Sequence, residues 1–155
     1  MKWKKEFLLI LIFIVSQLNA QEIQLLHSGN KVSLRGLSVV NDQVFWASGS
    51  KGMVARSTDG GKTIDWMQVS GYAQRDFRDI HAFDSNTAII MGIAEPAVML
   101  RTEDAGRTWT KVFEDTTKGM FLDALDFQGS YGVVIGDPIK DSVYLAMSTN
   151  GGRSW

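Results

Sequence analysis

The sequence predicts an all-β fold, a β-propeller built of four-stranded antiparallel blades. One short motif occurs three times, and its first residues, Ser57, Thr102 and Ser148, lie 45 residues (57 to 102) and 46 residues (102 to 148) apart. Several short β-rich runs repeat together with the motif. A period of about 40 to 50 residues with several strands in each unit is typical of propellers. The three copies of the motif span residues 57–63, 102–109 and 148–155.

The repeat divides the chain into three units of approximately 33–69, 76–113 and 120–155, each of which we expect to form one blade. The first and second units each contain four apolar or β-branched runs separated by Gly, Asn, Asp and Ser, and the third contains three. Such runs between turn residues predict strands. The expected strands are 34–40, 44–47, 53–56 and 66–69, then 77–83, 88–91, 98–101 and 109–113, then 121–127, 133–135 and 143–147.

The first run of each unit is expected to be the innermost strand of its blade. Residues 77–83 and 121–127 share the pattern Phe-x-Asp-x-x-x-Phe, which aligns Asp79 with Asp123. The polar residues of the inner strands could form a ligand-binding cluster near the channel, or they could bond one blade to the next. Equivalence between repeats favours the structural role, since buried charges normally come paired. The polar candidates are Arg35, Arg78, Asp79 and Asp123.

The repeated motif is expected to form a tight turn between the third and fourth strands. An Asp or Asn side chain, or a hydroxyl, can accept hydrogen bonds from backbone N–H groups of its own turn, and glycine suits a positive φ. Acidic ligands at EF-hand spacing are missing from the motif, which argues against a calcium loop. We therefore assign to folding Ser57, Asp59, Gly61, Thr102, Asp104, Gly106, Trp109, Ser148, Asn150, Gly152 and Trp155.

These motifs resemble the Asp-box, or bacterial neuraminidase repeat, with the pattern Ser-x-Asp-x-Gly-x-Thr-Trp. The first copy departs from the pattern with Ile64 where Trp is expected. The third copy has Asn150 in place of Asp, which keeps one acceptor oxygen. The resemblance implies a propeller, and it leaves the function open because many unrelated functions use this fold.

The units as a whole resemble the photosystem II stability/assembly factor-like propellers over roughly residues 23–155. The Phe-x-Asp-x-x-x-Phe strands and the segment 136–138, Gly-Asp-Pro, look like the secreted, non-photosynthetic branch of that family. The resemblance implies a partner held through an arginine patch. Arg35, Arg75 and Arg78 are the arginines of this chain that could form a comparable positive rim.

The first 20 residues have the order of a secretory signal peptide. Three lysines at positions 2, 4 and 5 precede an unbroken apolar run of nine residues, 7–15, and a short polar tail ends at Ala20. This order predicts cleavage after Ala20 and export to the periplasm, the cell surface or the medium. An uncleaved membrane anchor is the alternative, and a run of this length is short for a spanning helix.

Residues 21–155 are expected to form only part of a propeller. Leu26 precedes Leu34 by eight residues, as Val69 precedes Phe77, so residues 23–26 are expected to be an orphan closing strand of another blade. Propellers use about four to eight blades. We expect a fragment of a six- to eight-bladed ring, and the alternative is a ring assembled from several chains. An open arc exposes strand edges, which predicts self-association.

Composition excludes several classes of function. The chain of 155 residues has a formal net charge of −1, so it lacks the broad basic surface of a nucleic-acid-binding protein. It contains no cysteine and only two histidines, which lie far apart in the sequence, and no dinucleotide-binding glycine motif is present. We therefore expect no metal and no cofactor, and we expect contact with a membrane only through the signal peptide.

We expect an exported, noncatalytic propeller scaffold that binds a protein or glycan partner through its channel face. The alternative is part of a secreted sialidase-like glycosyl hydrolase, which would need an arginine cluster, a tyrosine–glutamate pair and an acid. No Arg-Ile-Pro motif of such enzymes is present, because the only prolines are Pro96 after Glu95 and Pro138 after Asp137. A third possibility is a repeat module within a larger surface assembly. We therefore assign no catalytic residue.

Overall fold

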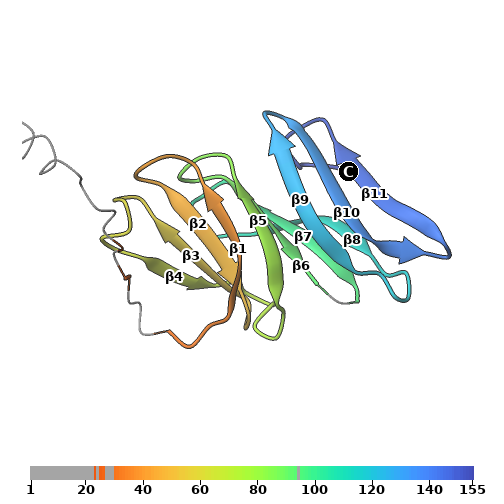
Figure 1. Ribbon diagram of the computed structural model, residues 1–155, viewed down its shortest axis with the longest axis horizontal. Helices are drawn as coiled ribbons and strands as arrows, with labels where there is room; N and C mark the ends of the chain where they lie inside the picture. The colour runs from red at the N-terminus through yellow and green to blue at the C-terminus, as the bar shows by residue number, and fades with distance from the viewer. Residues whose placement is uncertain (1–22, 24, 27–29, 94) are drawn as a thin grey trace, which may run out of the picture.

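The computed structural model describes residues 23, 25, 26, 30–93 and 95–155, and these residues form eleven β-strands in three antiparallel sheets. The sheets stand side by side along the molecule (Figure 1). The strands of the first are β1 (Leu34–Val39), β2 (Phe45–Gly49), β3 (Met53–Ser57) and β4 (Asp65–Gln68). The strands of the second are β5 (Phe77–Ala82), β6 (Ala88–Gly92), β7 (Ala97–Thr102) and β8 (Thr110–Asp115).

The third sheet contains three strands. They are β9 (Leu122–Gln128), β10 (Tyr131–Ile139) and β11 (Ser142–Ser148). In each sheet the strands pair in chain order. The prediction of two four-stranded blades followed by a blade without its outer strand is thus confirmed. We call the sheets blades 1, 2 and 3.

The described part of the chain contains two apolar cores, one between each pair of neighbouring blades. Trp46 and Val54 of blade 1 pack with Ile80 and Leu100 of blade 2. On its other face, blade 2 packs against blade 3. The residues at the centre of this second core are Ile89, Met91, Met99, Leu122, Leu125 and Val134. A blade therefore has no core of its own and is stabilised by the blades beside it.

Each innermost strand, β1, β5 and β9, carries a one-residue bulge at the same place. The registers skip Arg35, Arg78 and Asp123. In each case the residue before the skipped one pairs with a glycine of the second strand. The equivalence predicted between Asp79 and Asp123 is therefore wrong, because Asp123 stands at the position of Arg78. The Phe pattern misled the alignment since Phe121 precedes β9, whereas Phe77 begins β5.

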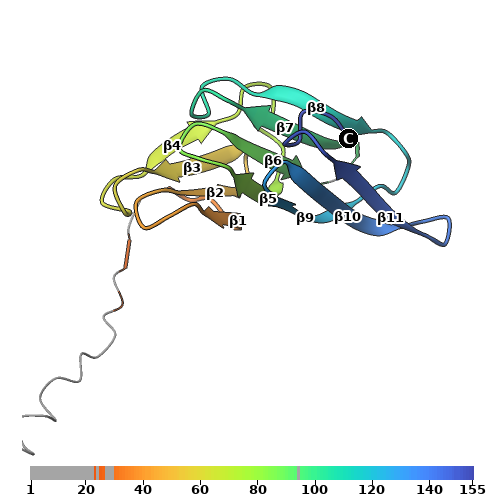
Figure 2. The same cartoon turned by 90° about the horizontal axis from the view of Figure 1, so that it is seen from above.

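The two ends of the blades differ in their turns. The repeated turns between the third and fourth strands lie at one end, which we call the motif end. The segments that link one blade to the next, 69–76 and 116–121, lie at the other, which we call the linker end. Three backbone bonds tie the motif end together, with Gly60, Ala105 and Gly151 donating to the turns between first and second strands. Figure 2 shows the blades from above.

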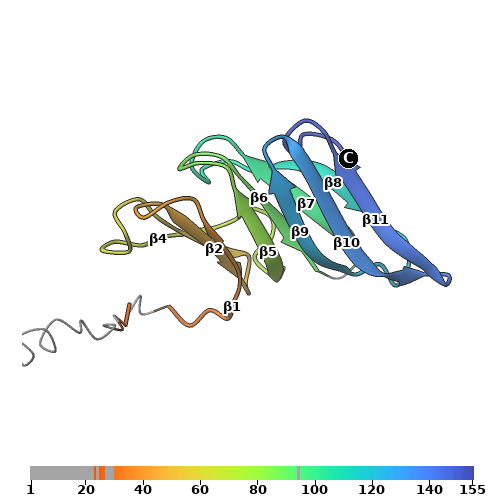
Figure 3. The same ribbon diagram turned by 45° about the horizontal axis from the view of Figure 1, so that its top comes forward.

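Two predictions concern the N-terminal segment, the signal peptide and the closing strand. The predicted signal peptide, 1–20, lies outside the described residues. Of the predicted closing strand, Ile23, Leu25 and Leu26 are described and none is in a strand, because the described residues contain no further blade with which they could pair. Leu26 lies against Gly61 of the first repeated turn. Figure 3 shows the three blades from an intermediate angle.

Candidate functional site at the linker end

The repeated turns at the motif end use their polar side chains internally. Ser57 Oγ accepts a hydrogen bond from the Gly61 amide at 2.9 Å, and Asp59 accepts from the amide of Thr63 at 2.9 Å and from its hydroxyl at 2.7 Å. The same three bonds recur in the second copy, among Thr102, Asp104, Gly106 and Thr108. In the third copy Ser148 accepts from the Gly152 amide and Asn150 accepts from the Ser154 amide, but Asn150 donates to the Ser154 hydroxyl. These side chains therefore shape the turns.

The carboxylates of these turns are held ionised by the same bonds. Hydrogen bonds from the amide and then the hydroxyl of Thr63 lower the pKa of Asp59 from its ordinary 3.8 to about 2. In the second turn, the hydroxyl and then the amide of Thr108 lower the pKa of Asp104 to about 2. Several hydrogen bonds donated to a carboxylate stabilise its charged form and so lower its pKa. Neither carboxyl group is thus suited to donate a proton near neutral pH.

The tryptophans that follow the turns pack against the cores. Trp109 lies against the core between blades 1 and 2, and its indole N–H donates to the Gly106 carbonyl at 3.1 Å. Trp155 lies against the second core, with its ring 5.7 Å from that of Phe127. Both residues thus extend the apolar cores between the blades.

The bulged residues of the inner strands form ion pairs between blades at the linker end. Arg35 of blade 1 lies 3.2 Å from the carboxylate of Asp76, the residue before β5. Arg78 of blade 2 lies 3.5 Å from the carboxylate of Asp123 in blade 3 and also donates to its carbonyl at 3.0 Å. The side chains of both arginines are 40% exposed, so the pairs remain accessible to a partner.

Asp79 has a different environment from the bulged residues. Its carboxylate accepts hydrogen bonds from the amides of Ile80 and Leu125, both at 2.9 Å. The Leu125 bond joins blade 2 to blade 3, and Ser38 joins blade 1 to blade 2 by accepting from the Ala82 amide at 2.9 Å. The geometry thus gives Asp79 a structural role, in contrast to the pairs of Arg35 and Arg78.

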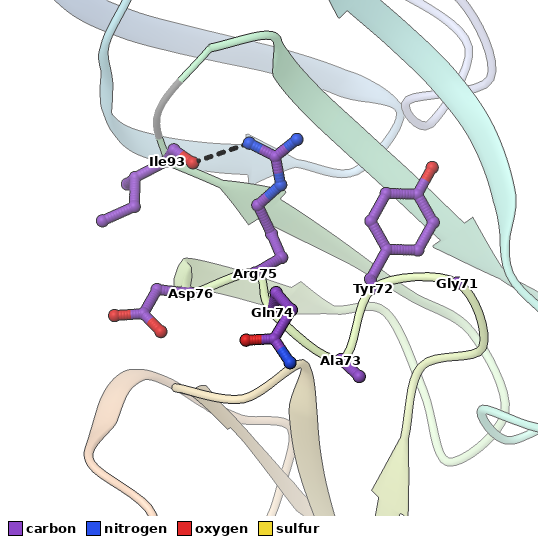
Figure 4. Close-up of a pocket in the computed structure, with 7 residues that line it drawn as sticks. All are labelled: Gly71, Tyr72, Ala73, Gln74, Arg75, Asp76 and Ile93. Atoms are coloured by element: carbon purple, nitrogen blue, oxygen red, sulfur yellow. Dashed lines mark hydrogen bonds between the residues drawn. The ribbon is translucent and has the colours of Figure 1, made fainter.

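A cavity of about 760 Å³ opens beside the Arg35–Asp76 pair, at the linker between blades 1 and 2. Figure 4 shows the Arg75 guanidinium above it, with the Tyr72 ring on one side and Gln74 below. Arg75 donates to the Ile93 carbonyl at 3.0 Å. The cavity is lined by Gly71, Tyr72, Ala73, Gln74, Arg75, Asp76 and Ile93.

Sequence reasoning named Arg75 for the positive rim but missed Tyr72, Gln74 and Asp76. No sequence pattern marks these three residues, because they meet only where the linker 69–76 folds against β6 and the start of β5. Asp76 precedes β5 directly, and a charge beside the end of a strand was the one signal that could have drawn attention to it.

A second cavity, of about 390 Å³, lies at the motif end between blades 2 and 3. Arg101, which is buried, donates to the Gly151 carbonyl at 2.9 Å and also bonds Glu103, which pairs with Arg153 at 2.8 Å. These groups satisfy one another across the blade boundary, so this cavity has a structural explanation.

Neither a metal centre nor a membrane-spanning helix is found among the residues that the structure describes. Among them, no group of three or more His, Asp or Glu side chains is arranged to hold a metal ion. Within the same residues, no helix has the length and apolar character needed to cross a membrane.

The comparisons with known proteins identify the fold. No family model and no curated protein matches the chain. A solved structure of YCF48 bound to D1 peptide is similar with a TM-score of 0.63 and 19% identity, over 82% of this chain and 39% of that chain. YCF48 from Cyanidioschyzon merolae is similar with a TM-score of 0.61 and 19% identity, over 82% of this chain and 40% of that chain.

YCF48 is a photosystem II assembly factor with a β-propeller fold. The likeness, at this identity, shows that the chain has the fold of part of such a propeller. It agrees with the resemblance to the assembly factor-like propellers at the level of the fold, and it does not test the Asp-box or the secreted branch. The chain spans about two fifths of the length of these two structures' chains.

Proposed function

We propose that the chain is part of an exported, noncatalytic β-propeller scaffold that binds a protein partner at the linker end of its inner strands. The observation that carries this proposal is that Arg35 and Arg78 occupy the same bulged position on neighbouring blades, and that Asp76, the partner of Arg35, lines a cavity. A bulge re-aims a side chain and is often found next to a functional site. The two arginines are partly exposed, and their planar guanidinium groups suit recognition of carboxylates.

Two further observations support a protein as the partner. One of the similar structures is YCF48 bound to D1 peptide. The linker end also mixes charged, aromatic and amide side chains, a composition that suits a polypeptide with several kinds of side chain. A glycan partner remains an alternative within this proposal, since both ligands would use the same end of the blades.

The test is site-directed photocrosslinking in the cells that make the protein. A crosslinking side chain replaces Lys118, which is exposed in the second linker and lies outside the cavity, or Lys62, which is exposed at the motif end. We expect a protein adduct from position 118 that Arg35→Ala together with Arg78→Ala removes, and none from position 62. Adducts from both positions, or from position 62 alone, would sink the proposal.

Export is the part of the proposal that depends on the N-terminal sequence. Cleavage after Ala20 leaves Gln21 as the first residue of the mature protein. N-terminal sequencing of the protein purified from its cells tests this directly. An intact Met1 or a cytoplasmic location would contradict export without affecting the binding proposal.

A further inference from the structure

The third repeated turn has an amide side chain where the other two have a carboxylate. Asn150 occupies the position of Asp59 and Asp104, and Gly151 follows it. No other asparagine of the sequence is followed by glycine. Because glycine has no Cβ beside its nitrogen, it hinders attack of that nitrogen on the preceding side chain least. The third turn therefore contains a side chain that can react with its own backbone.

The reaction is deamidation through a succinimide ring. The backbone nitrogen of Gly151 gives up its proton and forms a C–N bond with the side-chain carbonyl carbon of Asn150. The bond from that carbon to the side-chain nitrogen breaks, and the nitrogen leaves with the proton as ammonia. Water then opens the ring at one of its two carbonyls, which gives aspartate or isoaspartate. Water is the only co-reactant, and asparagine is among the thermolabile residues of proteins.

The first two turns resist the same attack. Asp59 is also followed by a glycine, but its carboxyl group can leave only after protonation. Hydrogen bonds from the amide and then the hydroxyl of Thr63 lower the pKa of Asp59 to about 2, so this group is ionised at neutral pH. Asp104 is ionised for the same reason and is followed by Ala105, whose Cβ hinders attack. Only Asn150 has a side chain that reacts without being protonated first.

The closed third turn engages both reacting groups in hydrogen bonds. Asn150 accepts from the Ser154 amide at 3.1 Å and donates to the Ser154 hydroxyl at 2.9 Å. The Gly151 amide, whose proton must leave, donates to the Ser130 carbonyl at 2.8 Å. Asn150 is exposed, so water reaches it once these bonds break. Local opening of the turn must therefore precede the reaction.

We propose that Asn150 is a site of spontaneous deamidation, which the closed third turn suppresses and local opening of the turn permits. The aspartate product gives the third turn the carboxylate that the first two turns have. The isoaspartate product adds a methylene group to the backbone, so residue 150 no longer stands at the spacing from Ser154 that the turn requires. This site is independent of the proposed function.

The experiment incubates the protein that contains this chain at neutral pH in water labelled with heavy oxygen, either folded or in urea. Trypsin cleavage after Lys140 and Arg153 gives the peptide 141–153, in which Asn150 is the only side-chain amide. Mass spectrometry measures the label at residue 150, and chromatography separates the aspartate and isoaspartate peptides. We expect labelling in both samples, at least about tenfold faster in urea, because only opening exposes the reacting groups in the folded protein.

Asn86, which is followed by threonine, is the internal control. It is the only side-chain amide of the tryptic peptide 79–101, and it should remain unlabelled while residue 150 becomes labelled.

The decisive variant is Gly151→Ala, because the chain itself has alanine at the equivalent position. Ala105 has a φ of 65° and Gly151 a φ of 69°. A Cβ on Gly151 would meet only Arg153 Nη1, at 3.6 Å, so the variant should keep the fold. We expect it to deamidate severalfold more slowly than the wild type in urea. This comparison is made between unfolded chains, so it holds even if the alanine lowers stability.

Ser154→Ala tests the protection that the turn gives. It removes the hydroxyl to which Asn150 donates and leaves the backbone amide in place. We expect faster deamidation in the folded protein and an unchanged rate in urea. Asn150→Asp reproduces the aspartate product and should unfold at the same temperature as the wild type or higher at neutral pH.

Absence of label at residue 150 in urea, or equal rates in urea for Gly151→Ala and the wild type, overturns the site. Equal rates in the folded protein and in urea overturn the protection by the closed turn. A markedly lower unfolding temperature of Asn150→Asp at neutral pH overturns the fit of the aspartate product.

Discussion

At the scale of single residues, we expect acid to weaken the repeated turns, because each of the first two turns is held by hydrogen bonds to its own Asp carboxylate. Asp59 and Asp104 have pKa values of about 2 in the folded protein against an ordinary 3.8. A lowered folded pKa stabilises the fold above the unfolded pKa, and the contribution is lost as the pH falls through the folded value. The stabilisation should therefore be complete above pH of about 5 and disappear between about pH 4 and pH 2.

The prediction is that Asp59→Asn together with Asp104→Asn removes this part of the acid sensitivity. Asparagine keeps the turn, because Asn150 already accepts from the Ser154 amide at 3.1 Å and donates to its hydroxyl at 2.9 Å. The unfolding midpoint measured from pH 6 to pH 2 should fall less steeply in the variant. Other carboxylates with lowered pKa values titrate in both proteins, so only the difference counts. Parallel curves would contradict the prediction.

Local contacts explain why the motif residues could be predicted from the sequence. Ser57 bonds residues two and four positions later, and the spacing of the motif encodes those bonds directly. Tyr72 and Asp76 gain their significance from Ile93 and Arg35, which are distant in the sequence. A single sequence carries no pattern for such contacts, so the positive rim was anticipated only through its arginines.

At the scale of elements, the inner strands show where the repeat was misaligned. The blades and their strand order were predicted because each run of apolar residues is bounded by turn residues. The bulges at Arg35, Arg78 and Asp123 were not predicted, since a bulge adds one residue to a strand without changing its composition. The shift of one residue moved Asp123 from the position of Asp79 to that of Arg78.

The close approach of inner strands gives a prediction for Gly36. A Cβ at this position would lie 2.8 Å from the Asp79 Cα and 2.5 Å from Ser48 Oγ, so Gly36→Ala should push blades 1 and 2 apart. We expect a loss of about 1–3 kcal/mol in the free energy of unfolding, measured by urea denaturation, as is typical of overpacking. The equivalent residue of blade 3 is Ala124, which is exposed.

Ala124→Ser is the matched control for that substitution. Its effect should stay within about 0.5 kcal/mol, as for most surface substitutions. Equal stability of Gly36→Ala and the wild type would show that the two inner strands can separate without loss, and that the contact between them is not tight.

At the scale of the whole molecule, the outward faces of blades 1 and 3 resemble the faces buried between blades. Leu37 of β1 is 67% exposed, whereas its equivalent in β5, Ile80, is 3% exposed. Leu145 of β11 is equivalent to Met99 of β7, because Leu145 pairs with Ile135 as Met99 pairs with Met91. Leu145 is 53% exposed, whereas Met99 is fully buried. Both outward faces therefore present side chains that the internal boundaries remove from water.

The last prediction is that residues 21–155, taken by themselves, self-associate in solution. Burying an exposed apolar side chain stabilises by about 1.5–3 kcal/mol, and each outward face offers several such side chains next to unpaired strand edges. Light scattering should give a mass above that of one chain.

Leu37→Lys together with Leu145→Lys should lower that mass, because a charge on each face opposes packing. Leu26→Lys is the control and should lower the mass less, because Leu26 lies beside the first repeated turn. A single monomeric species in the wild type, with cooperative thermal unfolding, would mean that the inter-blade faces can remain in water, and that apolar character alone does not drive blades together.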